Sequence, residues 1–188
     1  GAVLKSSAGH LRAAVAAEGG PAPADRLELA KKIEGYAAAA DSAIAQVKRL
    51  PVQRDLALTD DADGYLVTVR EIFRKQVVMN RSHQLYADSL RALNEHMRAD
   101  SRTGAWVGQA VIAKDRAERD FRDYRMASTS YVVLLEGLPA TEKKVEGVIG
   151  AGSVAPPEQL TRARARVLAT VKDAEKEIDF ARRLVGPR

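Results

Sequence analysis

Residues 65–97 read YLVTVREIFRKQVVMNRSHQLYADSLRALNEHM, and this stretch decides the fold. The residues at alternating spacings of four and three positions are mostly apolar, and they form one heptad seam: Tyr65, Val69, Ile72, Gln76, Met79, His83, Tyr86, Leu90, Leu93 and Met97. A seam held over this length predicts a single long helix that offers one continuous face to neighbouring helices. Two polar residues, Gln76 and His83, interrupt that face.

The composition of the 188-residue chain favours a single domain with a hydrophobic core. Apolar residues make up 46% and charged residues 29% of the chain, which is too apolar for a disordered protein. Aromatic residues make up only 5% while alanine is abundant, and this combination suits closely packed helices. We therefore expect residues 1–188 to form one all-α domain.

Helix-breaking residues divide the chain around the central seam. An N-terminal helical segment and four main helices are expected at residues 1–20, 25–50, 64–98, 103–137 and 157–185. Gly137-Leu138-Pro139 is interpreted as an interruption of the third main helix. The acidic residues Asp60, Asp61 and Asp63 are interpreted as caps at the start of the central helix. The expected fold is an elongated antiparallel up-and-down four-helix bundle with an additional short N-terminal helix.

The order of the helices predicts where the ends of the chain lie. Four antiparallel helices bring both chain termini to the end of the bundle that holds the turn at 99–103. The two longer connections, 51–63 and 138–156, are then expected together at the opposite end. A turn near residue 101 also sets the register of the central hairpin.

That register places a polar layer inside the bundle. Gln76 is expected opposite Tyr124 and Ser128, and His83 near Ala117 and Phe121. Such a layer fixes the alignment of helices at some cost in stability. A second interpretation is a small pocket in which Gln76, His83 and Tyr124, with Ser128 in the same layer, hold a polar ligand. A third is a rotation of the helices that exposes these side chains.

Basic residues are concentrated at the start of the last helix. Arg162, Arg166 and Lys172 are candidates for binding a polyanion, while Arg164 points toward the seam. The alternative is a solvated helix face, since the chain carries only five net positive charges and charges of both signs alternate along most helices. No aromatic residue stands nearby for base stacking, and acidic residues follow at once. Nucleic acid is therefore not the favoured partner.

The sequence contains no motif for catalysis or metal binding. Cysteine is absent, the three histidines stand far apart, and neither Glu-x-x-His nor His-Glu-x-x-His occurs. No glycine-rich phosphate loop and no Gly-x-Ser-x-Gly motif is present. We expect a non-enzymatic protein with no cofactor and no metal site.

Two functional hypotheses follow from the expected shape. The first is an extracytoplasmic bundle for ligand sensing or protein interaction, the soluble part of a membrane-anchored or secreted protein, with its partner or ligand at 51–63 and 138–156. No stretch approaches the roughly 20 apolar residues of a membrane span, so any membrane contact comes from segments outside this chain.

The second hypothesis is an oligomerising cytoplasmic scaffold, of which a homodimer is one form. Its basis is a set of aliphatic residues off the main seam, expected to be exposed: Val78, Leu85, Val132 and Leu134. Polyanion binding through the last helix remains a further alternative.

Overall fold

The all-α prediction is confirmed by a computed structural model that describes residues 1–50, 56–99 and 103–186. Within these ranges there are five α-helices, one short 3₁₀ turn and no strand. The elements are α1 (Ala2–Gly19), α2 (Arg26–Lys48), α3 (Leu56–Met97), α4 (Gly104–Ile149), η1 (Ala151–Ser153) and α5 (Pro157–Val185). No helix in the described ranges is both long and apolar enough to cross a membrane.

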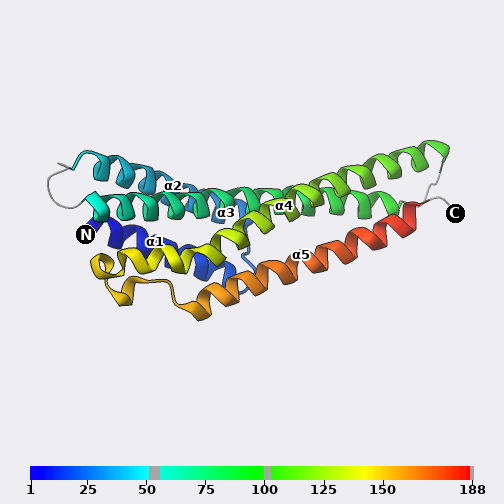
Figure 1. The fold of residues 1–188 in the computed structure, drawn as a ribbon. Coiled ribbons are helices and arrows are strands. Elements are labelled where there is room, and N and C mark those ends of the chain that lie inside the picture. Colours follow the sequence, from blue (N-terminus) through cyan, green and yellow to red (C-terminus); the bar gives the residue numbers. More distant parts are fainter. Residues whose placement is uncertain (51–55, 100–102, 187–188) are drawn as a thin grey trace.

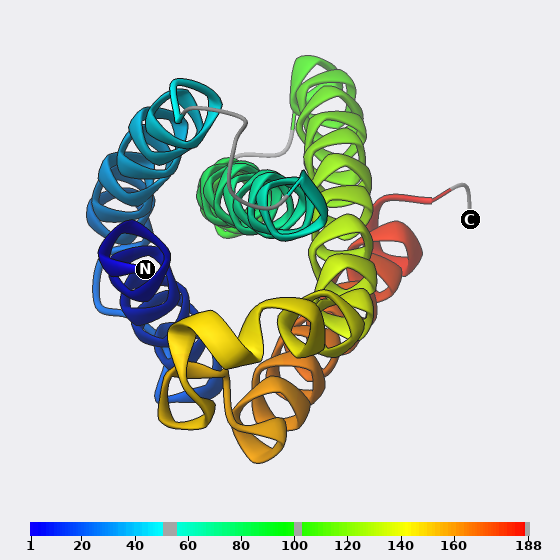
Figure 2. The same cartoon turned by 60° about the vertical axis from the view of Figure 1, so that its left-hand side comes forward.

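The helices pack side by side into a rod whose two halves differ (Figure 1). Helices α3 and α4 run antiparallel along most of the rod, and α5 follows α4. Helices α1 and α2 cover only one half, where α1 packs against α2, α3, α4 and α5. Seen closer to end-on, α3 runs through the middle of the assembly (Figure 2). The other half of the rod therefore consists of α3, α4 and α5 alone.

The heptad seam of α3 lies in the core as predicted. Seven of its ten residues are buried, including Tyr65, Val69 and Ile72, which are fully enclosed. The remaining three, His83, Leu90 and Met97, are only half-buried. Leu90 and Met97 lie in the half of the rod that α1 and α2 do not reach, and His83 lies at the boundary, near Arg26 at the start of α2. The seam is therefore fully covered only where five helices pack.

Helix α1 fills a slot between α5 and the α2–α3 pair. Its buried face carries residues at helical spacing: Leu4, Ala8, Leu11, Val15 and Glu18. A Cβ atom at Gly19 would lie 3.3 Å from the backbone nitrogen of Ala163, so the end of α1 approaches the α5 backbone closely. The guanidinium of Arg12 donates to the carbonyl of Gly152 at 2.7 Å. These contacts make α1 a full member of the bundle.

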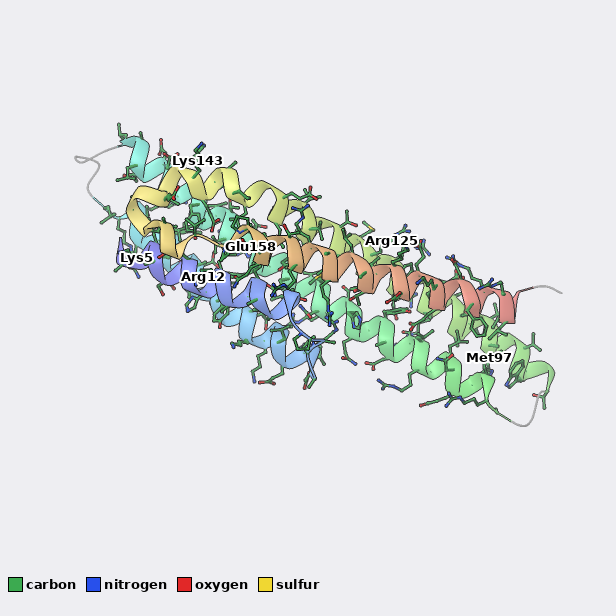
Figure 3. All side chains as sticks on the ribbon, turned by 90° about the horizontal axis from the view of Figure 1, so that it is seen from below. Lys5, Arg12, Met97, Arg125, Lys143 and Glu158 are labelled. Atoms are coloured by element: carbon green, nitrogen blue, oxygen red, sulfur yellow. The ribbon has the colours of Figure 1, made fainter. Side chains whose placement is uncertain are left out.

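The expected position of the chain termini is wrong because α1 adds one helix to the count. It runs antiparallel to α2, so the N-terminus lies at one end of the rod and the C-terminus at the other (Figure 1). In Figure 3, Lys5, near the N-terminus, lies at one end of the rod. Met97, the last residue of α3, lies toward the other end, where α5 also ends. An odd number of up-and-down helices places the two ends of a chain apart.

The predicted interruption at 137–139 is also wrong. Helix α4 continues through Pro139 to Ile149, although an internal proline costs about 3 kcal/mol in a helix. Leu135, Leu138 and Val145 are fully buried on one face of this segment, and Pro139 itself is exposed. The burial of that face offsets the missing backbone hydrogen bond.

Helix α3 begins earlier than predicted, at Leu56, and this changes the role of the acidic cluster. Asp60, Asp61 and Asp63 lie inside the helix, whose first turn carries no acidic residue, so they are not its caps. The buried Ala62 extends the α3 core face toward the N-terminus of the helix. Of the expected connection 51–63, residues 51–55 fall outside the described part of the chain, as does most of the 99–103 turn.

The four aliphatic residues expected on the surface divide into two groups. Val78 and Leu85 are exposed, whereas Leu134 is half-buried and Val132 is buried in the core. Within this part of α4, Val132 is buried next to Tyr131, so the buried face of the helix is wider here than a single row of residues. Val132 therefore offers no surface to a partner.

Candidate functional site

A buried polar network joins α1 to α3 at the middle of the rod. The Gln76 side-chain amide donates to the Glu18 carboxylate and to the carbonyl of Ala14, both at 2.9 Å. The Asn80 amide donates to the same Glu18 oxygen at 2.7 Å. Gln76 and Asn80 are fully buried and Glu18 almost so. A buried carboxylate needs such donors, because an unsatisfied charge inside a protein is costly.

Asn80 extends this network to α2. Its side-chain oxygen accepts a 3.0 Å hydrogen bond from the Arg26 guanidinium. Arg26 is the first residue of α2, and its position is set by Asp25, whose carboxylate accepts from the backbone N–H groups of Leu27 and Glu28. One amide side chain thus contacts partners on three helices.

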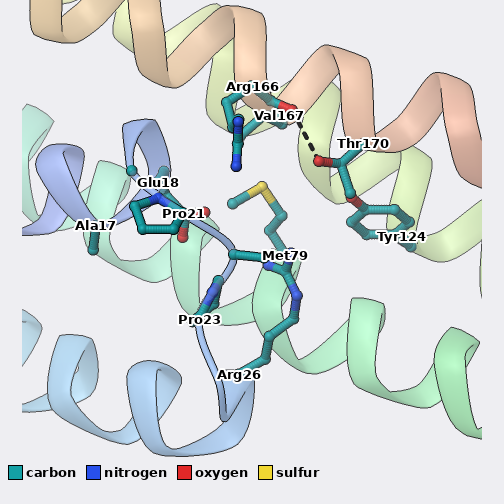
Figure 4. A pocket seen from close by; sticks show the side chains of 12 residues that line it. Ala17, Glu18, Pro21, Pro23, Arg26, Met79, Tyr124, Arg166, Val167 and Thr170 are labelled. Atoms are coloured by element: carbon teal, nitrogen blue, oxygen red, sulfur yellow. Dashed lines mark hydrogen bonds between the residues drawn. The ribbon is translucent and has the colours of Figure 1, made fainter.

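A small cavity of about 30 Å³ opens beside the network, with room for about two waters. Figure 4 shows Arg26 and Arg166 reaching toward it from opposite sides, with Met79 between them. Tyr124 and Glu18 also line this cavity. Two groups of residues that the sequence analysis treated separately, the polar layer and the basic cluster, therefore meet here.

A larger hollow of about 530 Å³ adjoins the small cavity, which we call the junction hollow. Both are lined by Arg26, Arg166 and Thr170. The junction hollow is also lined by His83 and Arg91. It lies where α1 has ended and the chain turns through residues 20–25 to begin α2.

Aromatic rings pack beneath the junction hollow. The ring centroids of His83 and Tyr124 lie 4.8 Å apart, edge to face, and His83 also meets Tyr86 at 6.3 Å. Desolvation and then the nearby Arg26 charge lower the pKa of His83 to about 4, which makes it neutral at pH 7. Burial raises the pKa of Tyr124 to about 12, despite the opposing effect of Arg26.

Beyond the junction hollow, a groove continues between α3 and α5. Two further hollows, of about 620 and 200 Å³, share lining residues with their neighbours and follow one another to the end of the rod. Tyr86 forms part of the lining, and its hydroxyl donates to the Glu177 carboxylate at 2.8 Å. Within the described ranges, no Cα atom of α5 comes within 8 Å of one in α3. We call this feature the open groove.

Of the residues predicted for the polar layer, Tyr124 contacts both His83 and Ser128, whereas the Gln76 side chain has its partners on α1. Gln76 binds Glu18 of α1, and His83 contacts Tyr124, about one helical turn from the level expected for it. Ser128 is buried, and its hydroxyl donates to the Tyr124 carbonyl of its own helix. Ser128 does not line the cavity.

The basic candidates separate in the structure. All three candidates, Arg162, Arg166 and Lys172, are exposed, and of these only Arg166 lines the cavity and the junction hollow. Arg164 is half-buried and lies 3.7 Å from Glu136. The structure therefore places one of the predicted basic residues at the edge of the hollow and the other two away from it.

Three residues of the site were missed by the sequence analysis: Glu18, Arg26 and Asn80. A signal is present for two of them. Glu18 continues the α1 spacing of Leu4, Ala8, Leu11 and Val15, and Arg26 stands four positions before Ala30, where the spacing of the buried α2 residues begins. A charged residue at a seam position needs a partner. Asn80 has no comparable signal, since it stands beside the seam of α3.

Within the described ranges, no group of three or more metal-ligating side chains lies close enough to hold an ion. Comparison of the chain with family models, curated proteins and solved structures finds no match. The chemistry of the site is therefore argued from its own residues. They offer hydrogen-bond donors, guanidinium groups and an apolar groove.

Proposed function

We propose that this protein is a non-enzymatic interaction bundle that binds an amphipathic helix of a partner protein in the open groove. One observation carries the proposal: beyond the end of α1 the backbones of α3 and α5 stay apart, bridged by the Tyr86 side chain, and the open groove lies between them. The chain leaves the slot at Gly20–Pro23, and the groove begins where it leaves. A helix is thus the element that already completes the bundle over the first half.

The lining of the open groove suits the apolar face of a helix. Leu90 and Met97 belong to the α3 seam and are half-exposed, while Phe180 and Leu184 of α5 are more than half exposed. Covering such side chains is favourable by roughly 25 cal/mol per Å² of apolar surface. A partner with apolar residues at positions i, i+3, i+4 and i+7 would cover both walls.

The rims of the groove specify the flanks of that helix. The α3 rim carries Arg91 and Arg98 beside one acid, Glu95, and the α5 rim carries Asp173 and Glu177. A helix with an acidic flank toward α3 and a basic flank toward α5 complements these charges. Rim charges of this kind set orientation and association rate more than affinity.

A partner was expected at the connections 51–63 and 138–156. Much of both segments is helical, and the proposal therefore concerns the groove instead. The extracytoplasmic, membrane-attached location was inferred from termini at a common end. Because the termini lie at opposite ends, that location is not part of this proposal.

The absence of cysteine makes a site-specific test simple. Asn94→Cys, which lines the groove, would carry an environment-sensitive dye, and Val133→Cys on the outer face of α4 serves as the matched control. The probe is a synthetic peptide of residues 1–19, because α1 has the apolar spacing that the slot accepts. A second peptide has the same composition in an order that destroys this spacing.

We expect the α1 peptide to shift the emission of the Asn94 label to shorter wavelength. The dissociation constant should be roughly 10–100 µM, since a free peptide of this length must first be ordered. The reordered peptide and the Val133 label should give no response. Equal responses from the two labels or the two peptides would refute groove binding. Light scattering over a concentration series then shows whether a second copy of the chain can supply the helix.

A further inference from the structure

Arg166 is an exposed residue of α5 that lines both the small cavity and the junction hollow. Its guanidinium makes no hydrogen bond and no ion pair with any residue in the described ranges. Figure 4 shows it directed toward Met79 and Arg26. Arg162 of the same helix also has no ion pair with a described residue, so what distinguishes Arg166 is its place at the hollow. The N–H donors of Arg166 are therefore available to a ligand bound there.

Arg26 faces the same hollow and is likewise not neutralised by a direct ion pair. Its one hydrogen bond goes to the neutral amide of Asn80. Asn80 stands between Arg26 and the Glu18 carboxylate, which takes its own hydrogen bonds from Asn80 and Gln76. The network therefore holds Arg26 in place while its remaining donors stay available.

The charges around the junction hollow are mainly positive. Arg26, Arg91 and Arg166 line it, against a single acid, Asp173. Arg91 lies 3.3 Å from Asp88 and Asp173 lies 3.2 Å from Lys176, so each also has a partner outside the hollow. Glu18 lines the small cavity but not the junction hollow.

We infer that the junction hollow is a binding site for a small dianion, one that carries either two carboxylates or a phosphate. Guanidinium groups bind both kinds of oxyanion through paired N–H donors, and two of them approach the hollow from different helices. The volume of about 530 Å³ lies within the range of small-molecule sites. This inference goes beyond the helix-binding function, because the hollow and the apolar end of the groove are lined by different residues.

The ligand would also act on the bundle. It would contact the start of α2 through Arg26 and the middle of α5 through Arg166, two helices that have no Cα atoms within 8 Å of each other in the described ranges. Binding to the folded state alone raises the midpoint of thermal unfolding. The site thus gives the bundle a means to respond to a metabolite, as the sensing hypothesis requires.

Isothermal titration calorimetry with succinate and with inorganic phosphate, each in a buffer free of other multivalent anions, tests the inference. Arg166→Gln is the informative variant, because its side chain holds no structural contact and the fold should survive the change. Arg162→Gln and Lys172→Gln are the matched controls, since they remove the same charge from the same helix outside the hollow. Unfolding midpoints confirm that all variants are folded.

We expect at least one of the two anions to bind with a stoichiometry of one, and Arg166→Gln to weaken it at least tenfold. The two control variants should change the affinity less than twofold. Preference for succinate assigns a dicarboxylate, and preference for phosphate assigns a phosphorylated ligand. Failure of both anions to bind at 10 mM, or equal losses in the controls and in Arg166→Gln, would overturn the inference. Peptide binding to the open groove is measured separately and does not depend on either result.

Discussion

Asn80 holds three helices together with a single side chain. It accepts from Arg26 on α2, and it donates to Glu18 on α1 and to the Gln76 carbonyl one turn earlier on α3. Its two amide hydrogens and one oxygen are all used, and none of its surface is exposed. A side chain whose every polar atom is paired in a dry site fixes the helices in one relative position.

Replacing Asn80 with leucine should therefore destabilise the protein strongly. The change leaves a buried carboxylate with fewer donors and a half-buried arginine without its acceptor, which costs about 2–4 kcal/mol. Urea unfolding followed by circular dichroism measures the loss. Asn94→Leu, on an exposed position of the same helix, should change the free energy of unfolding by less than about 0.5 kcal/mol. A similar small change for Asn80→Leu would show that the network contributes little.

His83 makes the stability of the protein depend on pH. Its pKa in the folded state is lowered to about 4, whereas the unfolded chain has a value near 6.5. The unfolded state therefore binds the proton first, and folding stability falls as the pH is lowered from 6.5 to about 4. A ring titration by NMR should give a midpoint near 4. The stability of the variant His83→Gln should fall less between pH 6.5 and 4 than that of the original protein. An equal fall in both proteins would contradict the lowered pKa of His83.

At the scale of single elements, the sequence predicted the helix with the most regular seam and failed where two signals competed. The spacing from Tyr65 to Leu93 identified α3 because nothing within it opposes a helix. In α4, Pro139 argues for a break while Leu138 and Val145 argue for continuation, and burial decides the outcome. The free energy gained by burying Leu138 and Val145 depends on contacts with other helices. The spacing of residues within one segment gives no information about those contacts.

The Glu142 side chain connects the end of α4 to the segment that follows it. Its carboxylate accepts from the backbone N–H of Ala155 at 3.0 Å, and its second oxygen is buried without a partner. Burial raises the pKa of this carboxyl group, an effect only partly offset by the hydrogen bond from Ala155. The ionised form is thus disfavoured in the folded state, and stability falls as the pH rises above the ordinary value of 4.5.

The variant Glu142→Gln should consequently be more stable at pH 8. Glutamine keeps an oxygen for the Ala155 N–H and removes the buried charge, which should raise the melting temperature by roughly 3–6 °C. Near pH 4 both side chains are neutral, and the difference should disappear. Glu146→Gln, one turn further along on an exposed position, is the control and should show no such gain. A loss of stability at pH 8 would mean that the charge itself is needed.

At the scale of the whole molecule, the sequence predicted the bundle but neither the position of its ends nor the partners of its polar layer. Gln76 was identified because it interrupts a seam, yet its partner Glu18 lies 58 positions away along the chain. The spacing along one helix shows that a buried amide side chain needs a hydrogen-bond partner, but it does not identify that partner. The expected position of the N-terminus was at the wrong end because α1 was treated as a minor addition to four helices. The candidate site also depends on α1, since it forms where that helix ends.

The unequal halves of the rod should differ in their rate of opening. In the five-helix half, residues 69–77 of α3 and 131–138 of α4 are covered on several sides, whereas residues 90–97 of α3 and 174–185 of α5 border the open groove. Segments with fewer buried contacts open at lower free energy, so their amide hydrogens exchange faster. Hydrogen exchange followed by mass spectrometry should show exchange at least ten times faster in 90–97 and 174–185. Saturation with the α1 peptide should slow these two segments and leave 131–138 unchanged. Equal protection of the amide hydrogens along the whole of α3 in the free protein would contradict the proposal. It would show that the bundle is already complete without a partner helix in the groove.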